Sequence, residues 1–146
     1  MSISYWMIDG IGIDTDKLRG KLDYKKVVDL LVKWWGEDDD LLEMQETACY
    51  DELDLDSFFD GAFCDNLGDF LCMCDDKKVM TYGDNGDGGV YFYYPPSMPW
   101  QRGPNEPKSI DEVHQCIIKA VQCVTNLTED DIEVMINDDL YVVGIG

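Results

Sequence analysis

One stretch decides the fold class: KVMTYGDNGDGGVYFYYPP, residues 78–96. β-Branched and aromatic residues flank a segment of Gly, Asn and Asp, and Pro95 and Pro96 end the stretch. Branched and aromatic side chains favour strands, whereas Gly, Asn and Asp adopt the backbone angles of tight turns. The stretch therefore predicts a β-hairpin. Its turn has the composition of a calcium loop, but Gly86 stands where an EF-hand needs a ligand, so a plain turn is favoured.

Strands are also predicted at the two ends of the chain. The opening ISYWMIDGIGI, residues 3–13, is rich in strand formers, and Gly10 and Gly12 indicate a bulge or tight bend. The closing LYVVGIG, residues 140–146, has the same character. Terminal strands, a central hairpin and intervening helices predict one α+β domain over residues 1–146. Its small sheet would be mainly antiparallel and packed with helices.

Three amphipathic helices are predicted, at residues 22–36, 109–124 and 128–136. Each begins with a residue type that caps helix N-termini, namely Asp23, Ser109 and Thr128. The segments 51–63 and 67–74 are predicted to be short helical or irregular pieces.

Length and composition favour a folded protein. The chain has 146 residues, 45% of them apolar, and its aromatic residues are four Trp, eight Tyr and five Phe, which a disordered acidic chain would lack. It shows no signal peptide and no apolar run near the roughly 18 residues that span a bilayer. We therefore expect a location in the cytoplasm, with the six cysteines reduced.

The negative charge is concentrated in one part of the chain. The net charge is −20, and residues 34–76 hold fifteen acids and no lysine or arginine. So strong a single-sign field attracts cationic partners and repels DNA and anionic membranes. We therefore expect neither direct nucleic-acid binding nor membrane binding.

The same segment alternates acids with aromatic residues, as a protein-binding surface would. Nucleic-acid enzymes line their channels with Lys and Arg, which carboxylates can meet in place of phosphates. The candidate partner-binding acids are Glu37, Asp38, Asp39, Asp40, Glu43, Asp51, Glu52, Asp54, Asp56 and Asp60. The candidate apolar anchors are Trp34, Trp35, Tyr50, Phe58 and Phe59. The alternative is that the acidity serves solubility alone.

A zinc site is the second chemical possibility. Cys72 and Cys74 would face one side if their backbone were extended, but would point about 200° apart on a helix. With His114 they form a thiolate and imidazole set that favours zinc, and Cys64, Asp75 or Cys116 could complete it. The alternative is that the cysteines are inert core residues. No nucleophile motif or convincing pair of catalytic carboxylates is present, so we expect no enzymatic activity.

Three segments carry a resemblance to a known group: SISYWMIDGIGI (2–13), TYGDNGDGGVYFYYPPSMPW (81–100) and EPKSIDEVHQ (106–115). They resemble small acidic phage and mobile-element proteins of Gram-positive bacteria, a group linked to type II anti-CRISPR proteins. The resemblance implies a non-enzymatic inhibitor that binds a basic surface of an RNA-guided DNA nuclease and blocks DNA binding. It implies a location in the cytoplasm of a bacterial host cell, and it implies no catalytic residue. The alternative is a zinc-stabilised phage or bacterial housekeeping or immunity domain.

Overall fold

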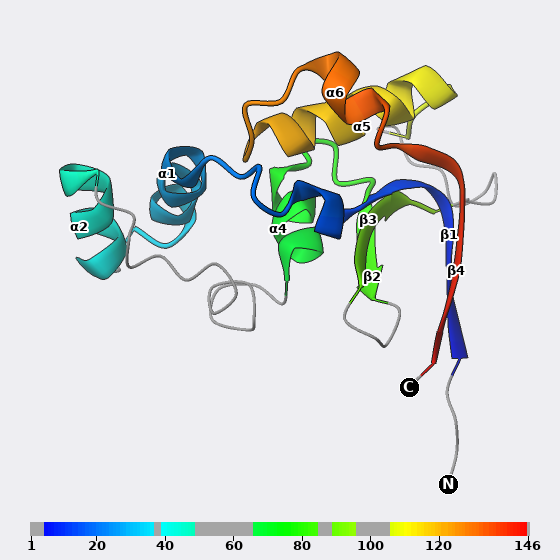
Figure 1. Ribbon diagram of the computed structural model, residues 1–146, viewed down its shortest axis with the longest axis horizontal. Coiled ribbons are helices and arrows are strands. Elements are labelled where there is room, and N and C mark those ends of the chain that lie inside the picture. Colours follow the sequence, from blue (N-terminus) through cyan, green and yellow to red (C-terminus); the bar gives the residue numbers. More distant parts are fainter. Residues whose placement is uncertain (1–4, 37–38, 49–65, 85–88, 96–105, 146) are drawn as a thin grey trace, which may run out of the picture.

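The computed structural model describes residues 5–36, 39–48, 66–84, 89–95 and 106–145. Its four-stranded antiparallel sheet has the order β2-β3-β1-β4. The strands are β1 (Tyr5–Asp14), β2 (Thr81–Asp84), β3 (Val90–Tyr94) and β4 (Asn137–Ile145). The two terminal strands lie side by side, and helices lie between the strands in the chain, which confirms the predicted α+β domain (Figure 1).

The predicted hairpin is present as β2 and β3. Tyr82 lies opposite Phe92, and Asp84 lies opposite Val90. Phe92 is fully buried, because its side of the hairpin faces the helices. The turn residues 85–88 lie outside the described residues.

Strand β1 contains the predicted irregularity. Its register with β4 shifts between Gly10 and Gly12. Gly10 has φ +139°, and a Cβ there would lie 2.0 Å from the backbone oxygen of Tyr94, so only glycine fits without displacing the neighbouring strand. Past this bulge the pairing continues, and β4 therefore begins at Asn137 rather than at the predicted Leu140.

The helices begin where the capping residues predict. Asp23 accepts hydrogen bonds from two backbone N–H groups at the start of α1 (Tyr24–Trp34), and Ser109 caps α5 (Ile110–Gln122). Thr128 forms a capping box with Asp131 at the start of α6 (Glu129–Glu133). The other helices within the described ranges are η1 (Thr15–Leu18), α2 (Asp39–Thr47) and α4 (Leu67–Cys74). The predicted piece at 67–74 is therefore a helix, whereas the one at 51–63 lies outside the described residues.

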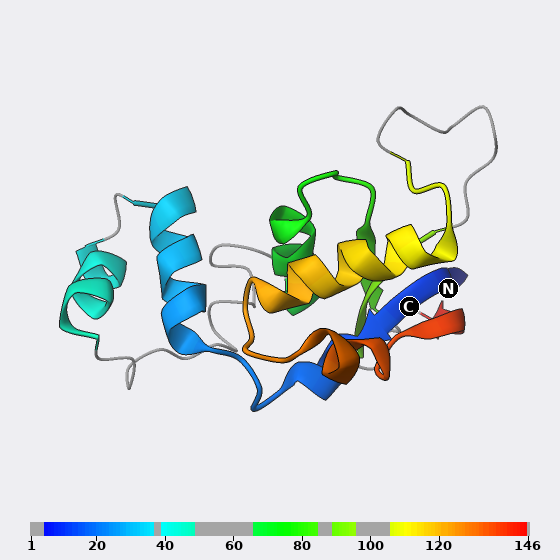
Figure 2. The same ribbon diagram turned by 90° about the horizontal axis from the view of Figure 1, so that it is seen from above.

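One hydrophobic core joins the sheet to α1, α4 and α5. Ile13 and Phe92 come from the sheet, Phe70 from α4, Ile117 from α5 and Leu31 from α1, and all five are fully buried. Helices α1 and α2 lie at one end of the molecule, and β1 and β4 lie at the other (Figure 2). Within the described residues, no helix has the length and apolar character needed to cross a bilayer.

Candidate partner-binding surface

Helix α2 carries the part of the acidic segment that the structure describes. Only Leu41 on this helix is buried, and α2 packs against α1. Gln45 donates a hydrogen bond of 3.1 Å to Asp29 of α1, which fixes the helix further. The exposed acids are Asp39, Asp40, Glu43 and Glu46. Helix α2 thus presents carboxylates to solvent from a position anchored on one apolar side chain.

The acids of α2 are placed where they repel one another. Asp39 and Glu43 are four residues apart, and Glu43 is three residues from both Asp40 and Glu46, so all are neighbours on the helix surface. Each such like-charge pair destabilises a helix by roughly 0.2–0.5 kcal/mol. Among the described residues, none of these four acids forms an ion pair with a base. Asp39 and Asp40 do favour the helix start electrostatically, but Glu43 and Glu46 have no such role.

The predicted binding acids divide into two groups. Asp39, Asp40 and Glu43 are brought together on exposed α2, as a binding face requires. The others lie outside the described residues: Glu37, Asp38, Asp51, Glu52, Asp54, Asp56 and Asp60.

Two of the predicted apolar anchors help to build the core instead. The Trp34 ring packs edge-on against Phe70, with 5.2 Å between centroids, and lies 6.0 Å from the Trp35 ring. Both tryptophans are half-buried against the hydrophobic core. This packing uses part of the apolar surface that an anchor would offer, and the anchor role of the two tryptophans stays a prediction. Tyr50, Phe58 and Phe59 lie outside the described residues.

A second acidic surface lies on α6 and the start of β4, where the sequence prediction placed none. No lysine or arginine follows Lys119 in the chain, a signal that the uneven distribution of bases could have revealed. The exposed acids of this surface are Glu129, Asp130, Asp131, Glu133, Asp138 and Asp139.

His114 of α5 lies between two of these acids. Its Nε2 is 2.5 Å from Oδ1 of Asp138, and its Nδ1 is 3.6 Å from Oε1 of Glu133. The His114 side chain is only 13% exposed. Burial lowers the pKa of His114, but the hydrogen bond and charge of Asp138 and the neighbouring Glu133 outweigh it, so the pKa is raised. His114 is therefore a charged link between α5, α6 and β4 at mildly acidic pH.

The geometry on which the zinc prediction depends is absent. Cys72 and Cys74 belong to helix α4, so their side chains point in different directions. His114 instead contacts Asp138. No group of three His, Cys, Asp or Glu residues within the described ranges is placed to hold a metal ion. The predicted grouping of Cys72, Cys74 and His114 through an extended backbone is thus wrong, and zinc binding itself stays a prediction.

The cysteines belong to the core and its edge. Cys74 and Cys116 are buried in the hydrophobic cluster, and Cys72 and Cys123 pack against it. Burial, with the charges of Asp69 and Asp75, raises the pKa of Cys72 to about 12. Burial and the adjacent Cys123 raise the pKa of Cys74 as well. Both thiols therefore keep their protons at neutral pH, whereas the thiolate is the reactive and metal-binding form.

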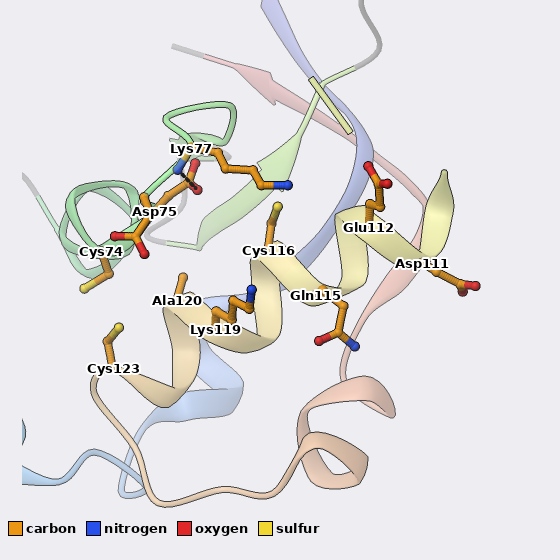
Figure 3. A pocket seen from close by; sticks show the side chains of 11 residues that line it. Cys74, Asp75, Lys77, Asp111, Glu112, Gln115, Cys116, Lys119, Ala120 and Cys123 are labelled. Atoms are coloured by element: carbon orange, nitrogen blue, oxygen red, sulfur yellow. Dashed lines mark hydrogen bonds between the residues drawn. The ribbon is translucent and has the colours of Figure 1, made fainter. Parts of the chain in front are cut away.

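A hollow of about 450 Å³ lies between α4 and α5 (Figure 3). Cys74 and Cys123 face one another in it, and Cys116 lies nearby. The buried Asp75 carboxylate accepts backbone hydrogen bonds from Lys77, Val79 and Met80. The Asp75 carboxylate, which borders the hollow, thus fixes the backbone of the segment between α4 and β2.

Comparisons with family models, with curated proteins and with solved structures gave no match.

Proposed function

We propose that this protein is a non-enzymatic inhibitor that binds a basic nucleic-acid-binding surface of an RNA-guided DNA nuclease. The acidic face of α2 docks in a channel lined by Lys and Arg and prevents DNA from entering it. The observation that carries the proposal is the self-repelling set of Asp39, Asp40, Glu43 and Glu46, which no lysine or arginine in the described part of the chain pairs with. Such a set costs folding stability and becomes favourable when a cationic partner neutralises it.

Three further features support the proposal. The net charge of −20 speeds encounter with a basic surface, and carboxylates on a helix can occupy positions that phosphates otherwise take. The segments 2–13, 81–100 and 106–115 resemble acidic phage proteins linked to anti-CRISPR activity.

The test measures DNA binding by a type II effector nuclease loaded with guide RNA, with and without this protein. We expect the protein to lower DNA binding, and we expect its own association rate with the nuclease to fall as salt rises. The variant Glu43→Gln/Glu46→Gln should bind more slowly by about tenfold, because exposed charges act mainly on the association rate.

This variant separates binding from folding. Glu46 lies in the last turn of α2, where negative charge opposes the helix dipole, and Glu43 lies mid-helix beside three like charges. Their neutralisation therefore does not weaken the helix. The matched control Glu129→Gln/Asp130→Asn removes the same charge from α6, at a different site. If both variants slowed association with the nuclease equally, the slowing would come from the lower net charge and not from the acids of α2. Unchanged DNA binding by the nuclease would refute the proposed function.

A further inference from the structure

Strand β4 forms one edge of the sheet and pairs with β1 on one side only among the described residues. It is nine residues long, and LYVVGI, residues 140–145, contains neither a charge nor a proline. Alternate backbone N–H and C=O groups of such a strand point away from the sheet and can pair with another strand. Proteins usually protect long edges with lysine, proline or a covering element, and among the described residues none of these protects 140–145. Such an edge can pair with a strand of a partner.

The face beside this edge is apolar and open to solvent. Tyr141 is 64% exposed, Val143 46% and Met7 53%. Met7 lies opposite Val143 in the β1 and β4 pairing, and Tyr141 is two residues from Val143, so the three side chains adjoin on one face. They form one contiguous patch beside the open edge.

The charges around this patch have one sign. Asp139 is exposed at the register shift just before Leu140, and it borders the same hollow as Tyr141. Asp9 of β1 lies directly opposite Tyr141 and is exposed. Neither acid forms an ion pair with a described base. A strand that added here would meet apolar surface in the middle and carboxylates beside it.

We propose that β4 binds an extended basic segment of a partner protein as a fifth strand of the sheet. Every second side chain of the bound segment lies on the exposed face of the sheet. On that face the segment places apolar side chains beside Tyr141 and Val143 and a lysine or arginine beside Asp139. Backbone hydrogen bonds supply affinity, and the alternating side chains supply specificity. A second copy of this chain fits less well, since two molecules of net charge −20 repel each other.

This site is independent of the proposed function. Helix α2 and strand β4 lie at opposite ends of the molecule (Figures 1 and 2), so a change at either leaves the other surface intact. Failure of the peptide experiment below would not affect nuclease binding by α2, and the reverse also holds.

The probe is a short capped peptide in which lysine, valine, valine and lysine alternate with threonine, a pattern that reads alike in both strand directions. We expect amide NMR shifts and slower hydrogen exchange confined to β4 and β1, weakened as salt rises. Two control peptides test how the segment binds. In the first, glutamate replaces lysine, which tests the role of charge. The second is N-methylated at alternate backbone nitrogens, which removes the backbone hydrogen bonds to β4. Both should bind at least about tenfold more weakly.

Protein variants locate the site. Tyr141→Lys should abolish peptide binding and leave the fold intact, because this side chain is exposed. Val134→Lys is the matched control, since Val134 is 83% exposed on the turn after α6, and it should bind the peptide normally. No binding at low salt, or equal binding of the N-methylated peptide, overturns the proposal. So does a dimer that Tyr141→Lys converts to monomer, because β4 would then bind a second copy.

Discussion

Nε2 of His114 lies 2.5 Å from Oδ1 of Asp138, which ties the first turns of α5 to the start of β4 across 24 positions of the chain. This contact joins the second acidic surface to the core. It also makes one part of the stability depend on pH, since His is the side chain that titrates nearest neutrality.

The pKa of His114 is raised in the folded protein, so protonation stabilises the fold. This contribution is fully present below the unfolded value of about 6.5 and is lost as pH rises through the folded pKa. Asp138→Asn should therefore lower the pKa of His114 and destabilise the protein more at pH 6 than at pH 9. Each unit of the decrease corresponds to about 1.4 kcal/mol. An NMR titration of the His114 ring measures the pKa, and denaturant unfolding at pH 6 and pH 9 measures the stability. An unchanged pKa in Asp138→Asn would show that Asp138 does not raise the pKa of His114.

Cys74 is expected to behave as a core residue. Cys74→Ser should lower the free energy of unfolding by about 1–3 kcal/mol, because it buries a hydroxyl in an apolar cluster. If Cys74 is a core residue alone, a strong chelator should leave the melting temperature of the untagged protein unchanged, and elemental analysis should find less than about a tenth of an equivalent of transition metal. Close to one equivalent of zinc, with a melting temperature that falls on chelation, would restore a metal role for these cysteines.

Asp75 is expected to be a major stability determinant. Asp75→Ala leaves the backbone N–H groups of Val79 and Met80 without their acceptor, which lies at 2.8 and 2.9 Å, in a site where Asp75 is 4% exposed. The cost should be about 2–5 kcal/mol by denaturant unfolding. The neighbouring Asp76→Ala is the control, because Asp76 is exposed, and should change stability by less than about 0.5 kcal/mol. Similar losses at both positions would argue against this role.

Gly10 is expected to tolerate no side chain. Gly10→Ala should destabilise the protein by more than about 3 kcal/mol, since the added Cβ overlaps the Tyr94 carbonyl and the backbone angle is strained. Gly20→Ala provides the comparison, because Gly20 also has positive φ but nothing lies within 4 Å of its Cβ position. Its cost should be about 1–2 kcal/mol. Equal melting temperatures for the two variants would mean that β1 and β3 separate easily at the bulge.

Local patterns predicted the elements that depend on neighbours in the chain. Aromatic and branched residues around a Gly-rich turn predicted β2 and β3, and the caps Asp23, Ser109 and Thr128 marked three helix starts. Helix α2 was not predicted, because it buries only Leu41 and has little apolar periodicity. The two readings of residues 72–74, helical or extended, could not be separated by spacing alone.

The sequence by itself determined an acidic α+β domain with strands at both termini, since composition and local periodicity carry that information. Only the tertiary structure decided that those strands pair with one another, that β4 lies at an edge, and that Trp34 packs on Phe70. It likewise decided that His114 meets Asp138 and that Cys74 faces Cys123. Each of these contacts joins residues far apart in the chain, where packing of the whole core, rather than local preference, sets which side chains meet.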